Sequence, residues 1–408
     1  MDGKSSLGTG ALPRGFEWGA VKAGIKASGN LDLAIAVAPG GAQAAVMFTS
    51  NQVVAAPVTV GRSHMASSGG RVRVVLVNAG NANCATGQAG IDGCEKTCVA
   101  AAETFGCIFD EVFPSSTGII GVPFPADKVV AAMPSLKAAL GATADHGEIF
   151  ARAIMTTDTR MKTATATITV DGKEVHIFGA AKGAGMIHPR LGPPHATMLV
   201  YIFTDIAADA ADLRSVLAPA VHGSFNSISI DGDTSTNDTV LLLASGASEA
   251  KLTDTSHEAF ASALNQVCSQ LAHAIVDDGE GVTHVITLDI SGCRNEAEAR
   301  TIARSIAHSP LCKTAWSSAD PNWGRLMAAA GYSGVEFDPA RVTVHIGDVP
   351  VYENGMRSPS FDEAAAHKTM LEREYTIAMN FAQGEAGCRF LTCDLTEEYV
   401  RINADYST

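Results

Sequence analysis

The stretch that decides the fold is KGAGMIHPRLGPPHATMLVYIF, residues 182–203. Gly183 and Gly185 permit backbone conformations that other residues avoid, and the prolines of the segment stiffen the approach to its apolar end. Residues 198–203 are apolar and rich in β-branched and aromatic side chains, which predicts a short buried strand. The hydroxyl of Thr197 then lies directly before the start of a rigid strand, where a nucleophile would be held. A capping or packing hydroxyl is the alternative that composition alone favours.

Strands and helices alternate on both sides of this stretch, which predicts the α/β (α+β) class. The longest predicted helix, 257–276, has one apolar stripe, and Thr255 and Glu258 would form its capping box. A chain of 408 residues is long enough for two domains or one bilobal unit. Strands are expected at 31–38, 44–49, 72–78, 162–170, 175–179, 227–230, 239–244, 341–346, 375–380 and 388–392, and further helices at 89–105, 129–140, 148–156, 210–220 and 296–308.

Composition excludes several classes of function. The formal charge of −14 argues against a nucleic-acid surface, because phosphate binding needs clustered Lys and Arg. No apolar run reaches the ~18 residues of a membrane span, and the first residues lack the apolar core of a signal peptide. Nine cysteines without a CxxC pair suit a reducing compartment better than a disulfide framework. We therefore expect a cytoplasmic protein that binds neither nucleic acid nor membrane.

Three loops carry candidate binding groups. Residues 78–83 (NAGNAN) follow a predicted buried strand and form either a ligand loop or an ordinary tight turn. Residues 114–121 (PSSTGIIG) combine small hydroxyl residues with glycine, which lets backbone N–H groups face an oxyanion or a phosphate. This segment is not a P-loop, because it lacks Gly-Lys-Ser/Thr. In DDGEG, residues 277–281, Glu280 stands between two glycines and is either a solvated helix end or a carboxylate aimed at a ligand amine.

Two further patterns resemble metal sites, and no metal site is predicted from either. The acidic loop 231–238 has the composition of a calcium loop but lacks the glutamate that completes one. Cys94 and Cys98 lie four residues apart on a predicted helix, where two buried apolar thiols are the simpler interpretation.

Taken together, these segments resemble the ornithine acetyltransferase family, also called glutamate N-acetyltransferase, of the arginine pathway. The matching stretches span nearly the whole chain in the same order. They are GIKASGNLDLAIAV (24–37), LVNAGNANCATG (76–87), SSTGIIG (115–121), MTTDT (155–159), AKGAGMIHP (181–189), ATML (196–199), FTD (203–205), SFNSISIDGDTSTNDT (224–239), DGEG (278–281), DPNWGRLMAAAGYSG (320–334) and YVRINADYST (399–408).

The resemblance implies a self-processing enzyme with an N-terminal nucleophile. The fold would be the αββα sandwich shared with L-aminopeptidase-like proteins, with a smaller α/β lobe in the C-terminal half. The precursor would cut itself between Ala196 and Thr197 into an α chain, 1–196, and a β chain, 197–408, that assemble as an α2β2 heterotetramer. Cleavage would place an α-amine, with a pKa of about 7.7–8.0 when unperturbed, beside the Thr197 hydroxyl as its general base.

The reaction implied is ping-pong transfer of an acetyl group from N2-acetylornithine to glutamate through an acetyl ester of Thr197. Thr117 and Gly118 match the oxyanion-hole pair of the family. Lys182 fits a substrate carboxylate and Glu280 an ornithine ammonium. No cofactor is implied, and whether acetyl-CoA is a second donor stays open. The family's substrate-binding positions fall on Thr156, Lys182, Thr197, Glu280, Asn403 and Thr408.

One departure from the family pattern lies just before the cleavage point. Six residues, 190–195, separate His-Pro from Ala-Thr, where most members of the family have about two, and this alters the strain on the bond to be cut. His195 either assists the cut or is a solvated loop histidine. Two other functions stay open: a self-processing amidase or aminopeptidase would use the same threonine with water as acceptor, and a non-catalytic paralogue would bind amino acids and remain uncut.

Overall fold

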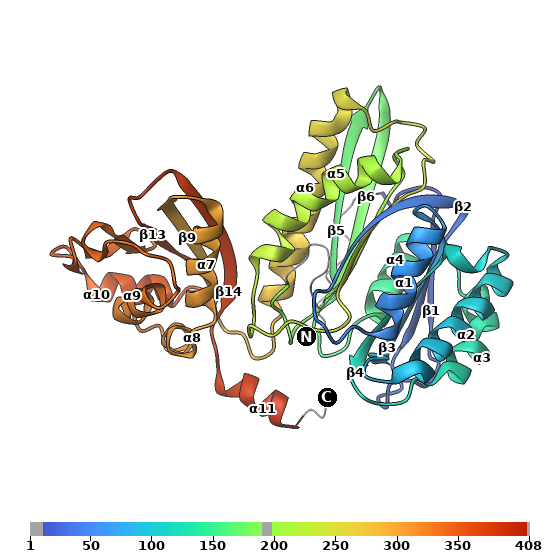
Figure 1. Cartoon of the computed structure of the whole chain (residues 1–408), viewed down its shortest axis with the longest axis horizontal. Helices are drawn as coiled ribbons and strands as arrows, with labels where there is room; N and C mark the ends of the chain where they lie inside the picture. The colour runs from blue at the N-terminus through green and yellow to red at the C-terminus, as the bar shows by residue number, and fades with distance from the viewer. Residues whose placement is uncertain (1–10, 190–197, 406–408) are drawn as a thin grey trace.

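A computed structural model of the chain describes residues 11–189 and 198–405, arranged as a large lobe and a smaller C-terminal lobe (Figure 1). Residues on both sides of the gap at 190–197 build the sheet of the large lobe, whose strand order is β4-β3-β2-β8-β7-β6-β5, with β1 paired to β2. The strands are β1 (Glu17–Val21), β2 (Leu33–Phe48), β3 (Arg71–Asn81), β4 (Val112–Ile119), β5 (Lys162–Val170), β6 (Lys173–Lys182), β7 (Leu199–Thr204) and β8 (Thr239–Ala244).

The long strand β2 folds this sheet into two layers. Its first part, Leu33–Val37, pairs with β1 and β3, its second part, Gln43–Phe48, pairs with β8, and the register with β3 shifts between Val37 and Ala42. The two predicted strands at 31–38 and 44–49 are therefore one bent strand. A bulge of this kind bends a strand and increases its twist.

Aromatic side chains fill the space between the two layers. Trp18 of β1 meets Phe178 of β6 and Phe203 of β7 edge-on, with ring centroids 5.7 Å and 5.5 Å away. β1 and β6 are not neighbours in the sheet, so this contact requires the two layers of the sheet to face each other. Edge-to-face pairs of this kind add ~0.5–1.5 kcal/mol beyond the burial of their area.

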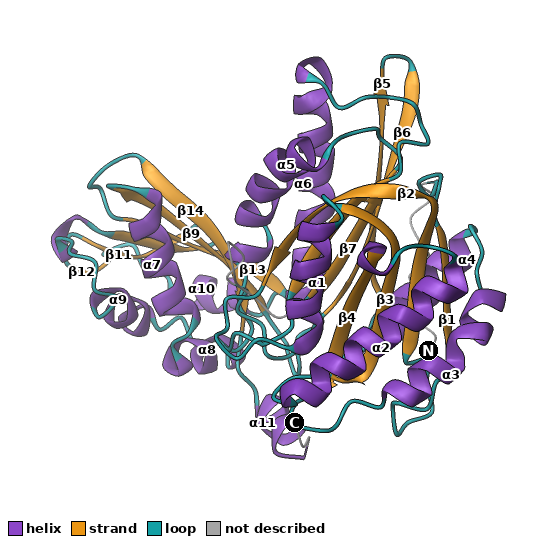
Figure 2. Ribbon diagram, turned by 45° about the vertical axis from the view of Figure 1, so that its right-hand side comes forward, coloured by secondary structure: helices purple, strands orange, loops and turns teal. Residues whose placement is uncertain are grey.

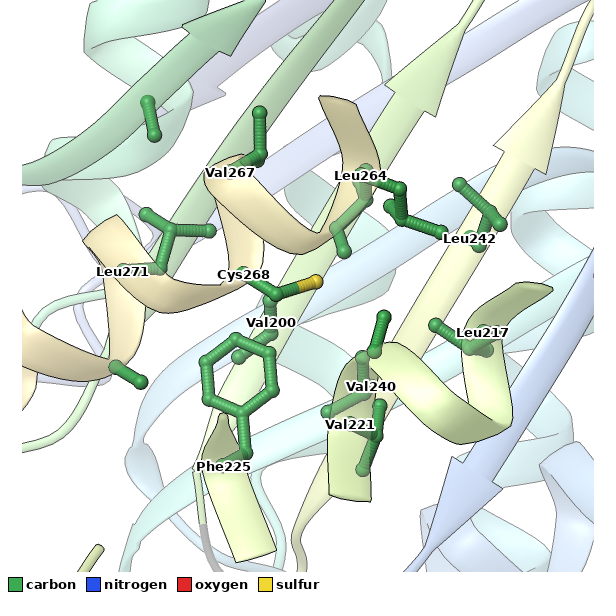
Figure 3. Packing of buried hydrophobic residues seen from close by; sticks show 14 of the residues in the cluster. Val200, Leu217, Val221, Phe225, Val240, Leu242, Leu264, Val267, Cys268 and Leu271 are labelled. Atoms are coloured by element: carbon green, nitrogen blue, oxygen red, sulfur yellow. The ribbon is translucent and has the colours of Figure 1, made fainter. Parts of the chain in front are cut away.

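Helices cover the two outer faces. On one side α5 (Ala210–Gly223) and α6 (Asp254–Asp277) pack on β6, β7 and β8, where Leu264 and Cys268 meet Val200 and Val240 (Figure 3). On the other side α1 (Ala56–Ser67), α2 (Gly87–Phe105) and α3 (Ala126–Ala138) pack on β2, β3 and β4. α4 (Ala144–Ala153) packs against β1. The αββα sandwich expected from the resemblance is confirmed.

The smaller α/β lobe is also present, with its own sheet in the order β12-β11-β10-β13-β9-β14 and its own hydrophobic core. The last helix, α11 (Glu397–Asp405), extends away from this lobe. It lies beneath the loops that join the smaller lobe to the sandwich (Figure 2). The remaining elements are β9 (Val285–Cys293), β10 (Thr343–Ile346), β11 (Val349–Glu353), β12 (Met356–Arg357), β13 (Glu374–Asn380), β14 (Ala386–Cys393), α7 (Glu296–Ala307), α8 (Pro310–Ser317), α9 (Trp323–Gly331), α10 (Glu363–Met370), and 3₁₀ turns at Phe109–Glu111, Phe225–Ser227 and Pro339–Arg341.

Three local predictions were wrong. Residues 78–81, expected to begin a turn, are the last part of β3 and pair with β4. Residues 227–230 form no named strand, because the chain makes a 3₁₀ turn at Phe225–Ser227 and only an isolated bridge at Ile228. The capping box of α6 uses Thr253 and Ser256 in place of Thr255 and Glu258. Within residues 11–189 and 198–405, no helix combines the length and apolarity that crossing a bilayer requires.

Candidate active site

A cavity of about 100 Å³ lies where loops of the sandwich meet α11. Every predicted site residue that the structure describes lines it: Thr117, Gly118, Thr156, Lys182, Glu280 and Asn403. These six come from four separate segments of the chain and from α11, so the fold brings them together. Ala196, Thr197 and Thr408 were also predicted for the site and lie outside the described residues, as does His195.

The second described range begins at Met198, close to this cavity. The carbonyl of Met198 accepts a hydrogen bond from the backbone N–H of Thr239 (2.8 Å), and Leu199 is the cross-strand partner of Lys182 at the end of β6. A cavity-lining side chain, Lys182, is thus fixed by the strand register directly opposite the first residue of β7.

Backbone packing at the end of β4 places Thr117 and Gly118. β3 and β4 run parallel with Gly80 opposite Gly118, and Gly118 has a φ of +130°. A side chain at Gly118 would collide with the backbone of Gly80 and Asn81, so only glycine fits. Gly80 itself has a φ of +108°, which also favours glycine. The end of β3 therefore supports the candidate oxyanion hole from the neighbouring strand.

Asn237 fixes the same segment from the other side. Its buried amide nitrogen donates to the carbonyl oxygens of Ala82 (2.6 Å) and Ser116 (2.9 Å), and its oxygen accepts from the Thr236 hydroxyl (2.6 Å). Because Ser116 precedes Thr117, this hydrogen bond holds the peptide plane on which the Thr117 backbone depends. Buried amide groups that are fully hydrogen-bonded in this way fix local geometry.

Lys182 contributes a buried ammonium group to the cavity. Its Nζ donates to Thr117 Oγ1 at 3.2 Å, and the residue is only 6% exposed. Burial lowers the pKa of Lys182, which the negative charges of Asp158, Asp238 and Glu280 oppose. An ammonium has three donors, and the described residues accept from one of them, which leaves two for a ligand.

A buried ion cluster, Asp158, Lys162 and Asp278, holds the surrounding loops. Lys162 Nζ lies 2.6 Å from Asp158 Oδ1 and 2.5 Å from Asp278 Oδ2, and all three side chains are at most 3% exposed. Asp158 also accepts from the backbone N–H groups of Thr156 (2.9 Å) and Gly183 (2.7 Å). Burial alone would raise the pKa of Asp158, but the positive charges nearby and the Gly183 hydrogen bond hold it well below its usual range. The cluster therefore ties together the segments that carry Thr156, Lys182 and Glu280.

The carboxylate of Glu280 packs directly against Gly185. A side chain at Gly185 would lie 2.5 Å from Glu280 Oε2, so the glycine leaves the space that this carboxylate occupies. The Glu280 backbone N–H donates to the Ala184 carbonyl (2.9 Å), and Asn403 Nδ2 of α11 donates to Glu280 Oε2 (2.8 Å). The KGAG loop (182–185) and α11 thus meet at this one carboxylate.

Asp231 and Asp238 come from the loop whose composition resembled a calcium site. Asp231 accepts from the backbone N–H groups of Met186 (2.6 Å) and Ile187 (2.9 Å) and from the Tyr399 hydroxyl (3.2 Å), so it braces the KGAG loop and α11. Asp238 is fully buried, and no described residue hydrogen-bonds to its carboxylate oxygens. Burial raises the pKa of Asp238 well above its usual value despite the charge of Lys182. Among the described residues no group of three His, Cys, Asp or Glu could hold a metal.

Sequence reasoning missed part of the lining of this cavity. Ser235, Thr236 and Asn237 line it beside Ala82, Ile120, Thr157, Gly185 and Met186. The cluster of hydroxyl and amide side chains in 234–237 was visible in the sequence, but its acidic neighbours suggested a metal loop. The described part of the lining offers one ammonium, one carboxylate and several hydroxyl and amide groups. This combination is complementary to a small zwitterion whose ammonium and carboxylate need partners of opposite charge.

Comparison with known proteins gives the family. A profile of the ArgJ family matches residues 17–408. An arginine biosynthesis bifunctional protein ArgJ from Methylococcus capsulatus is 44% identical over 398 residues, which are 97% of this chain and 95% of the relative. A protein of the same name from Thermus thermophilus is 42% identical over 97% of this chain and 99% of its own length.

Solved structures of proteins with related names also match. Arginine biosynthesis bifunctional protein ArgJ from Bacillus halodurans has 38% identity and a TM-score of 0.49, covering 52% of this chain and 100% of that chain. Ornithine acetyltransferase complexed with ornithine, from Mycobacterium tuberculosis, has 37% identity and a TM-score of 0.40, covering 45% of this chain and 96% of that chain. The family profile and the near-full-length identity to the relatives decide the assignment: this chain belongs to the ArgJ family.

Proposed function

We propose that this protein is an acetyltransferase of arginine biosynthesis that moves an acetyl group from N2-acetylornithine to glutamate. Membership of the ArgJ family supports the pathway, and one observation supports the substrates. The same small cavity holds the buried ammonium of Lys182 and the carboxylate of Glu280. Ornithine and glutamate share an α-carboxylate, and ornithine adds a second ammonium, so one cavity with both charges suits the donor product.

The nucleophile in this proposal is Thr197. The precursor cuts its own backbone between Ala196 and Thr197, which yields an α chain, 1–196, and a β chain, 197–408. The new α-amine accepts the proton of the Thr197 hydroxyl, and the hydroxyl oxygen attacks the acetyl carbonyl carbon of N2-acetylornithine. The carbon–nitrogen bond then breaks, the proton passes to the departing nitrogen, and ornithine leaves an acetyl ester on Thr197. The glutamate amine attacks this ester, the threonine oxygen regains a proton, and N-acetylglutamate leaves.

Thr117 and Gly118 are the proposed oxyanion hole. The hydroxyl of Thr117 and the backbone N–H of Gly118 would stabilise the negative oxygen of both tetrahedral intermediates. Their placement on a backbone locked by Gly80 and Asn237 supports this role, because an oxyanion hole works by being organised before the reaction. Removing one such donor typically slows the chemical step by ~10²–10³-fold.

Thr156, Lys182, Glu280, Asn403 and Thr408 are the proposed substrate-binding residues, together with Thr197. Glu280 would take the side-chain ammonium of ornithine, since among the described side chains Asn403 donates to Oε2 and none donates to Oε1, which is left for a ligand. We further propose that acetyl-CoA serves as a second donor, as the word bifunctional in the names of the relatives suggests. An α2β2 assembly in the cytoplasm completes the proposal, and no cofactor is part of it.

One assay separates this function from its alternatives. The protein is incubated with N2-acetylornithine with and without glutamate, and N-acetylglutamate and free acetate are quantified by mass spectrometry. Acetyl transfer with little free acetate supports the transferase. Stoichiometric acetate release with no N-acetylglutamate identifies an amidase, and neither product identifies a non-catalytic binding protein. Thr197→Ala is the matched control, which should stay uncut and form neither product.

A further inference from the structure

The hydrogen bond between Lys182 and Thr117 joins two residues to which the proposed function gives separate tasks, substrate binding and oxyanion stabilisation. Lys182 Nζ lies 3.2 Å from Thr117 Oγ1, both residues are 6% exposed, and both line the cavity. An ammonium cannot accept a hydrogen bond, so Thr117 Oγ1 is the acceptor of this bond. The proton on the Thr117 hydroxyl is thereby left to donate elsewhere.

We infer that Lys182 acts in the chemical step through Thr117, by polarising the hydroxyl that donates to the oxyanion. This inference rests on the proposed function. A hydroxyl that accepts a bond from a cation becomes a stronger donor through its own proton, because hydrogen bonds in a chain polarise one another in a low-dielectric site. As negative charge grows on the acetyl oxygen, the positive charge of Lys182 stabilises it through one intervening hydroxyl. The ground-state carbonyl is neutral, so the gain belongs mostly to the transition state.

The surroundings of Lys182 favour this role. The residue after it, Gly183, is anchored by its backbone N–H to Asp158 (2.7 Å), and the register of β6 with β7 fixes Lys182 itself. Within the described residues its Nζ forms no hydrogen bond to a carboxylate, so its charge is not consumed by a direct ion pair there. Carboxylates near it, Asp158, Asp238 and Glu280, act only at longer range. A buried cation held this way is organised in advance for a charge that appears during the reaction.

Two experiments distinguish this role from simple binding of a substrate carboxylate. The first uses a donor without the α-carboxylate, mono-N-acetyl-1,4-diaminobutane, and measures acetyl-enzyme formation by mass spectrometry. If Lys182 acts through Thr117, Lys182→Met slows this reaction by about tenfold or more, because the oxyanion is still formed. A rate within about twofold of the wild type would overturn the inference, since only the binding of the missing carboxylate would then depend on Lys182.

The second experiment measures the self-cleavage, which involves no substrate carboxylate at all. Lys182→Met should slow the cut, because breaking a peptide bond also passes through an oxyanion; cutting at the wild-type rate would count against the inference. Thermal unfolding verifies that the variant is folded, and Lys96→Met, which removes an exposed lysine paired with Asp127, is the control for lost charge. If Lys182→Met fails to fold, Lys182→Leu replaces it, because leucine likewise has neither the charge nor a donor for Thr117 Oγ1, and the same thresholds apply.

A double-mutant cycle tests the path itself. In a Thr117→Ala background, adding Lys182→Met should change the rate with the diamine donor by less than about threefold, because the hydroxyl that carries the effect is gone. An undiminished tenfold loss would overturn the inference. Failure of the proposed function would be seen separately, as a wild-type protein that makes no N-acetylglutamate whatever the lysine variants do.

Discussion

Replacing Gly185 by alanine should weaken ornithine binding while leaving the fold intact. The new methyl group would lie 2.5 Å from Glu280 Oε2 and 2.6 Å from Glu280 Cδ. To reach an ordinary contact of ~3.5 Å, the carboxylate must retreat by about 1 Å. Gly185 is not among the residues with positive φ, so alanine fits the backbone there. The glutamate is the end of a flexible side chain, and it absorbs the collision.

The loss of affinity depends on the strength of the contact that is displaced. A hydrogen bond to a charged group contributes ~1.5–3 kcal/mol, which is about a 10- to 150-fold change in a dissociation constant. Calorimetric titration with ornithine, the product that does not turn over alone, measures this directly. We expect the ornithine Kd of Gly185→Ala to rise by about 10-fold or more, with an unfolding free energy within ~1 kcal/mol of the wild type.

Two variants make this test decisive. Glu280→Gln should weaken ornithine binding to a similar degree, and adding Gly185→Ala to it should cost little more, because the ammonium partner is already lost. Gly331→Ala is the control, since a side chain at Gly331 meets no atom of the described residues within 4 Å. An ornithine Kd unchanged in Gly185→Ala, with the protein folded, would remove Glu280 from the ammonium site.

Two further predictions concern buried charges. Lys162→Met leaves the carboxylates of Asp158 and Asp278 buried without their cation, so chemical denaturation should show that the free energy of unfolding falls by ~3–5 kcal/mol. Lys96→Met, which breaks an exposed ion pair, should leave the free energy of unfolding almost unchanged. An equal loss in both variants would contradict the reasoning. Burial raises the pKa of Asp238 above its unfolded value of ~3.9, so the folded state keeps a proton that the unfolded chain releases, and stability falls as pH rises through that window. Asp238→Asn should therefore gain stability relative to the wild type, by ~1 kcal/mol or more, as pH rises above the unfolded value, and a difference that stays constant with pH would contradict it.

The strands and helices of the sandwich were largely predictable from the sequence, because their apolar residues recur with strand or helix period. The strand at 198–203 and the helix ending near residue 277 are of this kind. What periodicity does not contain is how β2 bends. The sequence pattern divides this strand in two at the glycine pair 40–41, yet both halves belong to one strand that pairs with β3 on one side and β8 on the other.

Most of the charged and proposed catalytic residues of the site were predictable from the sequence, but the hydrogen bonds and ion pairs between them were not. Motif resemblance pointed to Thr117, Lys182, Glu280 and Asn403, and the structure brings these together in one cavity. No local pattern indicates that Lys182 donates to Thr117, since 65 positions separate the two residues. The ion cluster around Lys162 depends on the same kind of long-range pairing. Such contacts are set by the sheet topology and become visible only in three dimensions.

The central claim is that a threonine freed by self-cleavage carries the acetyl group. Intact-mass spectrometry of the purified protein, before and after addition of N2-acetylornithine without glutamate, tests it most directly. We expect two fragments that separate at the Ala196–Thr197 bond, and after donor addition one acetyl group on the fragment that begins with Thr197, which glutamate then removes. A single uncut chain that transfers acetyl groups, or an acetyl group that stays on any other residue, would contradict the account.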